Sequence, residues 1–373
     1  MKDAIERVAF ALRAFEQGQI VVVTDDADRE NEADLIVAGV HATPDKLALI
    51  VRHTSGIVCA PIPGELAHRL NLTPMVAEND APHGTAFTIS IDYRHGLTSG
   101  ISAEERANTI KALADPNVKA GDFVRPGHVF PLIAREGGVL IRSGHTEAAV
   151  DLCRLANLPP VAAICELVND DGTVMRGQQV SNFADTWRFP VVSVADIIAW
   201  RQRRERLVER VEEFTISTPA GPAKAISYRT PFDPMQHLAV VVGDIRDGAG
   251  VLARLHREQI AEDVFGDGGS LAKSMARIAK EGRGVIIYLR EGAAGVSPNA
   301  NRGATEHPLG AHAEPNAGEP NAREEEWREI GLGAQILKDL GVTSIRLLAY
   351  RERRYVGLDG FGIAIQSTEK LDG

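Results

Sequence analysis

The first strong structural signal of this chain is the stretch Ile20-Val-Val-Val-Thr-Asp-Asp-Ala-Asp-Arg-Glu-Asn-Glu-Ala-Asp-Leu-Ile-Val-Ala38. Its two apolar ends predict buried strands. The six carboxylates between them are Asp25, Asp26, Asp28, Glu30, Glu32 and Asp34. Their mutual repulsion would be offset by a hard divalent cation, because oxygen ligands suit Mg²⁺ or Mn²⁺. A charged hairpin loop without a metal is the competing interpretation.

Length, charge and cysteine usage narrow the class of protein. The chain has 373 residues, enough for two domains, and its formal net charge of −10 argues against broad binding to nucleic acid or to anionic membranes. Its three cysteines form neither a CxxC pair nor a disulfide framework, which fits a reducing cytoplasm. The charged N-terminus predicts an amphipathic helix rather than a signal peptide, and no apolar run reaches membrane-spanning length.

Strand-like and helix-like segments alternate, so the expected class is α/β (an α+β sandwich in the first half) with a second α/β domain. The capping box Ser102-Ala-Glu-Glu105 predicts a helix that ends near Asp115. Thr146 is a predicted N-cap of a helix from Glu147 to about residue 157. The apolar segment Val161 to Val168 predicts a strand.

The predicted domains are residues 1–205 and residues 206–373. A helix capped by Ser193 is expected to continue through the mixed-charge segment that ends at Arg210, where we place the boundary. The clearest strands of the second half are predicted at residues 238–242, 285–289 and 344–349. Residues 291–322 are rich in Gly, Pro, Ala and Asn, which predicts a long mobile loop.

Two single residues are candidates for chemistry. His128 follows Arg125-Pro-Gly, a predicted turn that presents the imidazole at a strand start, where it could act as acid or base. A hydrogen-bonded turn histidine is the alternative. Cys59 follows two strand-like residues, and a buried cysteine is usually a small hydrophobe.

The segment Arg142-Ser143-Gly144-His145-Thr146 precedes a predicted helix. Free amides at a helix N-terminus, a glycine, an arginine and two hydroxyls predict a phosphate site, with His145 placed to coordinate a metal. An ordinary capped helix is the alternative. Glu166 lies inside an apolar strand, where a raised pKa would suit proton transfer. It could also point outward by alternation.

Residues 1 to about 205 resemble the 3,4-dihydroxy-2-butanone 4-phosphate synthase family. The matching stretches are Asp25–Asp34, Thr54–Pro61, Asp122–Leu132, Arg142–Ala148 and Cys165–Leu167. The resemblance implies conversion of a sugar phosphate, D-ribulose 5-phosphate, into L-3,4-dihydroxy-2-butanone 4-phosphate and formate. It also implies a lyase with two Mg²⁺ or Mn²⁺ ions per site, and a homodimer.

The resemblance also assigns roles to residues. Glu30 and His145 are the implied metal ligands, and His128 and Glu166 are the implied acid–base residues. Glu32 and Cys59 match positions close to the substrate, and we group them with the catalytic residues. The implied substrate contacts are Arg29, Glu30, Asp34, Arg142, Ser143, Gly144, His145, Thr146 and Glu166.

The second half resembles GTP cyclohydrolase II, from Gln236 to about Ile363. That family binds zinc through three cysteines, whose positions here hold Gln259, Ser270 and Ala272, and no cysteine follows Cys165. We therefore expect no zinc and a degenerate, non-catalytic domain. Its role in dimerisation, stabilisation or nucleotide binding stays open.

The leading interpretation is a cytoplasmic, monofunctional synthase of riboflavin biosynthesis that binds neither nucleic acid nor membrane. A bifunctional enzyme that also has GTP cyclohydrolase II activity is the first alternative. A non-catalytic scaffold protein and another Mg²⁺-dependent phosphosugar lyase or isomerase are the others.

Overall fold

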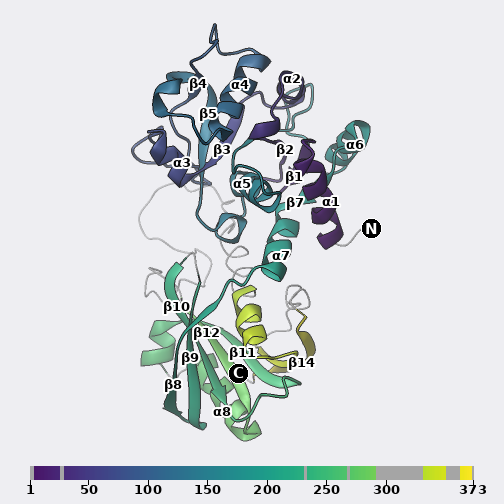
Figure 1. Cartoon of the computed structure of the whole chain (residues 1–373). Coiled ribbons are helices and arrows are strands. Elements are labelled where there is room, and N and C mark those ends of the chain that lie inside the picture. Colours follow the sequence, from purple (N-terminus) through teal and green to yellow (C-terminus); the bar gives the residue numbers. More distant parts are fainter. Residues whose placement is uncertain are drawn as a thin grey trace, which may run out of the picture. The chain divides into compact units, whose positions relative to one another are not determined.

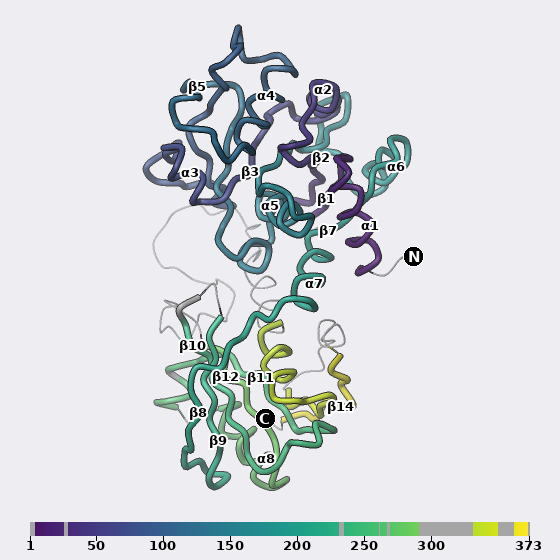
Figure 2. The backbone as a smooth tube through the Cα atoms, in the orientation of Figure 1, coloured from purple at the N-terminus to yellow at the C-terminus, as the bar shows by residue number. Residues whose placement is uncertain are grey.

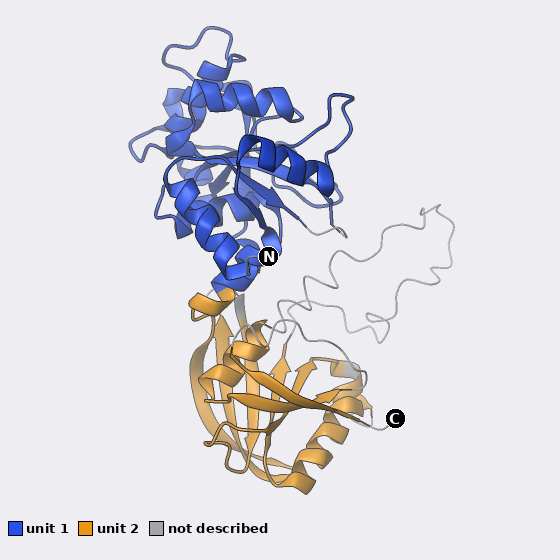
Figure 3. Cartoon of the chain, turned by 90° about the vertical axis from the view of Figure 1, so that its right-hand side faces the viewer, with its two compact units in different colours: residues 1–201 blue, residues 202–373 orange. Residues whose placement is uncertain are grey.

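The computed structural model describes residues 4–25, 29–230, 233–266, 269–290, 331–349 and 362–371. The chain forms two compact units, residues 1–201 and residues 202–373 (Figure 3). Each unit is a mixed α/β domain built on one sheet, which confirms the expected fold class. The predicted loop at residues 291–322 lies outside the described residues.

The first unit has a seven-stranded mixed sheet in the order β4-β5-β3-β6-β2-β1-β7 (Figure 1). Its strands are β1 (Val21–Thr24), β2 (Ala33–Ala38), β3 (Cys59–Pro63), β4 (Ile91–Tyr93), β5 (Phe123–Ala134), β6 (Ala162–Glu166) and β7 (Val191–Ser193). Its α-helices are α1 (Ala4–Glu16), α2 (Pro44–His53), α3 (Gly64–Arg69), α4 (Ala103–Ala114), α5 (His145–Leu155), α6 (Gln178–Trp187) and α7 (Val194–Arg204).

Helices cover both faces of this sheet, so its central strands are buried on both sides. In β1, Val22 packs into the cluster that contains Leu47 of α2 and Ile110 of α4. Its neighbour Val21 packs on the opposite face with residues of α1, α5 and α7. Because successive strand side chains alternate between faces, an apolar run such as Ile20–Val23 fits only a strand enclosed by two layers of helices.

The structure confirms some predicted boundaries and corrects others. Ser102 is the N-cap of α4, whose last residue is Ala114. The predicted N-cap Thr146 is wrong, because α5 begins at His145 and its N-cap is Gly144. The glycine takes the extended cap conformation without a side-chain cap, so Thr146 lies within the first turn.

The predicted continuation of the last helix is also wrong. Ser193 does accept a hydrogen bond from the Asp196 backbone N–H at 3.0 Å, as a helix cap should. However, α7 ends at Arg204, and Glu209 already begins a strand. This strand carries no apolar alternation that would mark it in the sequence, because residues 209–215 are all exposed, including Val211 and Phe214.

The second unit has its own seven-stranded sheet in the order β14-β13-β11-β12-β10-β9-β8. Its strands are β8 (Glu209–Thr218), β9 (Gly221–Thr230), β10 (Asp233–Val242), β11 (Val251–Arg257), β12 (Gly284–Leu289), β13 (Ser344–Ala349) and β14 (Ala364–Lys370). Helix α8 (Gly269–Glu281) packs on one face, and a helical segment at residues 331–339 packs on the other. The backbone path of each unit can be followed in Figure 2.

Among the described residues, no helix is both long and apolar enough to cross a bilayer.

Candidate active site and metal centre

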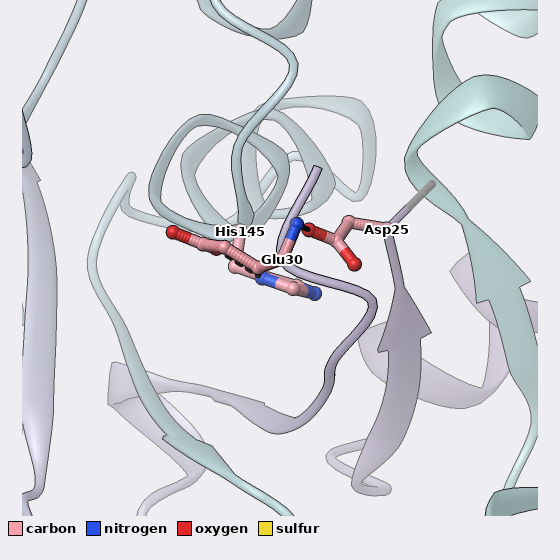
Figure 4. A group of neighbouring side chains, drawn as sticks. All are labelled: Asp25, Glu30 and His145. Atoms are coloured by element: carbon pink, nitrogen blue, oxygen red, sulfur yellow. Dashed lines mark hydrogen bonds and ion pairs between the residues drawn. The ribbon is translucent and has the colours of Figure 1, made fainter. Parts of the chain in front are cut away.

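Three side chains from separate elements converge beside the end of β1 (Figure 4). Asp25 directly follows β1, Glu30 lies in the connection to β2, and His145 is the first residue of α5. One potential ligand atom from each residue lies within 4.8 Å of the other two. The strand end and the helix N-terminus thus bring together residues that are about 120 positions apart in the sequence.

Asp25 also shapes the connection that carries Glu30. Its carboxylate accepts hydrogen bonds from the backbone N–H groups of Glu30 at 3.1 Å and Glu32 at 2.8 Å. Arg29 donates to the same carboxylate at 3.0 Å and also contacts Glu30. Asp25 therefore fixes the backbone from which the other acidic side chains project.

The chemistry of the donor set fits a hard divalent cation. Two buried atoms of the site, His145 Nε2 and Asp34 Oδ1, have no hydrogen-bond partner in the part of the chain that the structure describes. Buried polar atoms are normally paired, so such orphans point to a missing ligand. Two carboxylates and one imidazole suit Mn²⁺ or Mg²⁺, with water and substrate oxygens to complete the shell.

The charges of this site shift the pKa values of its members. Burial, reinforced by the nearby Glu166 carboxylate, raises the pKa of Asp34 well above its usual range. Burial and the Glu30 carboxylate raise the pKa of Glu32 to about 7. Burial lowers the pKa of His145, which favours the neutral imidazole that binds metals.

The predicted phosphate-binding segment lies at the N-terminus of α5. Its N-cap Gly144 offers no side-chain cap, so the amides of the first turn remain available for an anion. A Cβ on Gly144 would overlap the Arg142 guanidinium, so a larger residue would displace it. Ser143 and Thr146 flank this turn, with Thr146 buried.

Glu166 ends β6 and lies beside the acidic group. It pairs with Asp34 across the antiparallel ladder between β2 and β6, so both side chains project from the same face. Ser55 donates a hydrogen bond to its carboxylate at 2.6 Å. The alternative of an outward-pointing strand residue therefore does not describe Glu166.

Cys59 begins β3 and is buried in the core cluster of the α5 face. Burial raises the pKa of its thiol well above the ordinary value, and the Glu166 carboxylate adds to this effect. The thiol therefore keeps its proton at neutral pH, unlike a nucleophilic cysteine.

His128 contacts a carboxylate outside the acidic group. Its Nδ1 lies 2.7 Å from Asp92 Oδ2. The predicted turn at Pro126-Gly127 is not a strand start but part of β5, which spans Phe123–Ala134. The side chain of His128 is 41% exposed, so it faces open space on the side away from Asp92.

Three functional candidates were not assigned by sequence reasoning. Asp25 completes the ligand group, and its position directly after a strand was an available signal. Glu147 is buried and binds Arg142, while Asp92 is buried and binds His128. No sequence pattern identified the last two: Asp92 lies 36 residues from its partner, and the contact of Glu147 depends on where α5 begins.

The second unit has a buried polar network that includes Ser270, one of the three positions where the resemblance implies a zinc ligand. His256 Nε2 lies 3.0 Å from Asp263, and His256 Nδ1 lies 3.2 Å from the Ser270 hydroxyl. A catalytic zinc site of the expected kind needs thiolates, and all three cysteines of the chain lie in the first unit. These residues do not fit a three-cysteine zinc site.

Comparison with known families matches both units. The sequence model of 3,4-dihydroxy-2-butanone 4-phosphate synthase matches residues 9–200. The model of GTP cyclohydrolase II matches residues 209–370.

Curated relatives match along almost the whole chain. The riboflavin biosynthesis protein RibBA of Nocardia farcinica is 45% identical over 384 residues, which cover 99% of this chain and 90% of the relative. The protein of the same name from Mycobacterium tuberculosis is 44% identical over 382 residues, which cover 97% of this chain and 88% of the relative.

Solved structures give the same picture. RibBX from A. baumannii, described as a two-domain 3,4-dihydroxy-2-butanone 4-phosphate synthase, matches with a TM-score of 0.79 and 34% identity. The match covers 96% of this chain and 99% of that chain. A synthase in complex with two magnesium ions matches with a TM-score of 0.52 and 44% identity, over 53% of this chain and 97% of that chain.

These findings confirm the expected pair of domains, a synthase domain followed by one of cyclohydrolase type. They do not support the description of the second unit as degenerate, since the family model matches it over residues 209–370. They favour the bifunctional alternative over the monofunctional interpretation.

Proposed function

Because the chain belongs to the 3,4-dihydroxy-2-butanone 4-phosphate synthase family, we propose that it converts D-ribulose 5-phosphate into L-3,4-dihydroxy-2-butanone 4-phosphate and formate in riboflavin biosynthesis. One observation carries the proposal: the ligand group of Asp25, Glu30 and His145 shares the α5 N-terminus with the phosphate-binding segment. A phosphorylated sugar bound there would have its reacting carbons near the carboxylates.

The phosphate group would be held by the amides of the α5 N-terminus and by Arg142, with Ser143 and Thr146 as hydroxyl donors. The guanidinium of Arg142 is already held in place before any phosphate binds. Glu147 Oε2 accepts from its Nη1 at 2.7 Å, and Thr85 Oγ1 lies 3.1 Å from its Nη2. A guanidinium held on two sides loses little freedom when the substrate binds.

The carboxyl groups of Glu32, Glu166 and Asp34 would transfer the protons. The reaction needs a proton to leave a carbon next to a ketone and later needs protons returned. Glu32, with a pKa of about 7, exchanges a proton readily at neutral pH. Glu166 and Asp34 face the same space from neighbouring strands, so a proton can pass between groups at fixed separation. Arg29 would orient this carboxylate set.

Glu30 and His145, with Asp25, would hold the metal. A bound Mg²⁺ or Mn²⁺ supplies positive charge that stabilises negative charge developing on the sugar oxygens. A related synthase structure is in complex with two magnesium ions, which supports Mg²⁺ as the metal; two ions per site stay a proposal.

Other roles rest on the resemblance. We propose His128 as an acid–base residue and Cys59 as a neutral group close to the substrate. A homodimer, a cytoplasmic location and the absence of nucleic-acid binding stay predictions, and sedimentation velocity tests the first of them.

Product identification tests the synthase proposal. The purified chain is incubated with ribulose 5-phosphate and Mg²⁺, and the products are identified by mass spectrometry and NMR. A phosphorylated four-carbon ketone together with formate is expected. An isomeric pentose phosphate without formate would instead establish another phosphosugar isomerase.

GTP cyclohydrolase II activity is the second candidate function, for residues 209–370. The family match over this range and the full-length similarity to RibBA proteins favour it. Because the unit lacks cysteine, such activity would need a different set of ligands or no zinc at all.

GTP consumption by the full chain, with and without added Zn²⁺, distinguishes the two outcomes, and zinc content after dialysis is measured alongside. Consumption of GTP would establish a bifunctional enzyme. A folded chain that consumes no GTP even with zinc would leave the synthase as its sole activity.

A further inference from the structure

The strand that carries His128 contains a wide bulge. Strands β4 and β5 are antiparallel neighbours, and their register steps from Asp92 opposite Val124 to Ile91 opposite Val129. Residues 125–128 of β5 therefore have no register partner in the β4–β5 ladder. Such bulges re-aim side chains and commonly lie beside active sites.

Asp92 closes this bulge with both carboxylate oxygens. Its Oδ1 accepts a hydrogen bond from the His128 backbone N–H at 2.8 Å, and its Oδ2 lies 2.7 Å from His128 Nδ1. The Asp92 side chain is 4% exposed, whereas that of His128 is 41% exposed. The carboxylate is thus fixed in the interior, and the imidazole reaches outward from it.

This contact selects one form of the neutral imidazole. An ionised carboxylate only accepts hydrogen bonds, so Nδ1 must carry the proton that it donates to Asp92. The nitrogen that Asp92 does not engage is Nε2, which is left with its lone pair. The arrangement is that of a general base whose second nitrogen is oriented by a carboxylate.

Gly100 packs closely against the Asp92–His128 pair. It is buried with a φ of +85°, and a Cβ at this position would overlap Asp92 Oδ2 and come within 2.6 Å of His128 Nδ1. The turn that carries Gly100 is itself tied down, because Glu105 accepts hydrogen bonds from the Thr98 backbone N–H and hydroxyl. Only glycine leaves room for the pair at this point.

We propose that Asp92 is the positioning residue for His128. It holds the imidazole in the Nδ1–H tautomer, so that Nε2 takes and returns a proton during the reaction. This inference rests on the proposed function, in which His128 is an acid–base residue. Asp92 itself does not touch the substrate.

The first test replaces Asp92 with asparagine. The Asn amide would donate to Nδ1 instead of accepting from it, which reverses the tautomer of His128 to Nε2–H. The tautomer is read from the ¹⁵N chemical shifts of histidine-labelled full-length protein, with His128→Gln identifying the resonance. We expect Nδ1–H in the wild type, Nε2–H in Asp92→Asn, and a fall in kcat on the order of 10³–10⁴-fold with little change in KM.

The second test uses a matched pair of glycine variants. Gly96 and Gly100 both have positive φ, +77° and +85°, but a Cβ on Gly96 would meet nothing within 4 Å. Both Gly→Ala variants place an alanine at a positive φ. Only in Gly100→Ala would the new Cβ overlap the Asp92–His128 pair. We expect Gly100→Ala to lose kcat and Gly96→Ala to keep it.

The outcomes separate this inference from the proposed function. Because the tautomer is measured without substrate, a wild type that releases no formate would overturn the proposed function alone. An unchanged tautomer in Asp92→Asn, or a kcat within about threefold of the wild type, would overturn the positioning role. If Asp92→Asn does not fold, equal kcat values for Gly96→Ala and Gly100→Ala would overturn it as well.

Discussion

Glu147 and Arg142 form an ion pair at the N-terminus of α5, with Glu147 Oε2 2.7 Å from Arg142 Nη1. The side chain of Glu147 is 1% exposed, and its second oxygen accepts a hydrogen bond from the Arg135 backbone N–H at 3.0 Å. The arginine that we assign to the phosphate is therefore held by a buried carboxylate that the substrate does not replace.

The variant Glu147→Gln tests whether this ion pair positions Arg142 for the substrate. An amide supplies one acceptor where the carboxylate supplies two, so Arg142 or the Arg135 N–H loses its partner. Hydrogen bonds to charged groups contribute about 1.5–3 kcal/mol, so we expect KM for ribulose 5-phosphate to rise roughly 10- to 100-fold. Glu136→Gln is the control, since Glu136 is exposed on the preceding turn. An unchanged KM in Glu147→Gln would contradict the assignment.

Metal binding should stabilise the first unit. A ligand that binds only the native state raises the free energy of unfolding by about 2.7 kcal/mol at 100 times its Kd. We expect Mn²⁺ to raise the melting temperature of the wild type and of Glu78→Gln, whose side chain is exposed. Glu30→Gln should lose this response because it removes a ligand. Equal Mn²⁺ responses in all three proteins would place the metal elsewhere.

The turn that carries Gly100 should weaken in acid. Hydrogen bonds from the Thr98 backbone N–H and hydroxyl lower the pKa of Glu105 to about 2, from 4.5. A depressed folded-state pKa means that the ionised group stabilises the fold fully above about pH 4.5 and that this contribution disappears as the pH falls toward 2.

Melting temperatures between pH 6 and pH 3 check this dependence. The difference between the wild type and Glu105→Gln should be largest at the upper end and shrink as the pH falls. Glu104→Gln, an exposed neighbour on the same helix, should show no such trend. A difference that stays constant with pH would show that the ionisation of Glu105 does not matter.

A buried ion pair joins the second half of α5 to α7. Arg201 Nη1 lies 2.8 Å from Asp151 Oδ2 and also donates to the Gly137 carbonyl at 2.6 Å. Arg201→Met would leave the Asp151 carboxyl buried without its cation, which costs about 3–5 kcal/mol of unfolding free energy. Urea unfolding measures the loss, and Arg203→Met on the exposed face of α7 should change little. Equal stability of both variants would show that the pair contributes nothing.

Sequence alone predicted the elements whose signals are local. The apolar runs on either side of the acidic loop became β1 and β2, and the capping box at Ser102 opened α4. Thr146 was the wrong N-cap because Gly144 ends the preceding turn without any side-chain signature. The strand from Glu209 was missed because its first seven residues are all exposed, so the sequence shows no alternation of buried and exposed positions there.

The site residues also fall into two groups: those that the sequence indicated and those that only the fold brought together. The convergence of Glu30 and His145 was implied by resemblance to a family, and the fold shows the geometry. Asp92 and Glu147 act through contacts with segments about 36 and 5 residues away, which depend on strand register and helix start rather than on any motif. Their roles became visible only once β4 lay beside β5 and α5 began at His145.

Formate release from ribulose 5-phosphate by the purified chain is the most direct test of the synthase assignment. The assay is run with Mg²⁺, again after EDTA, and in parallel on Glu30→Gln and Glu78→Gln. Our account predicts metal-dependent formate from the wild type and from Glu78→Gln, and none from EDTA-treated protein or Glu30→Gln. No formate from folded, metal-loaded wild-type protein would contradict it and move the scaffold interpretation to first place.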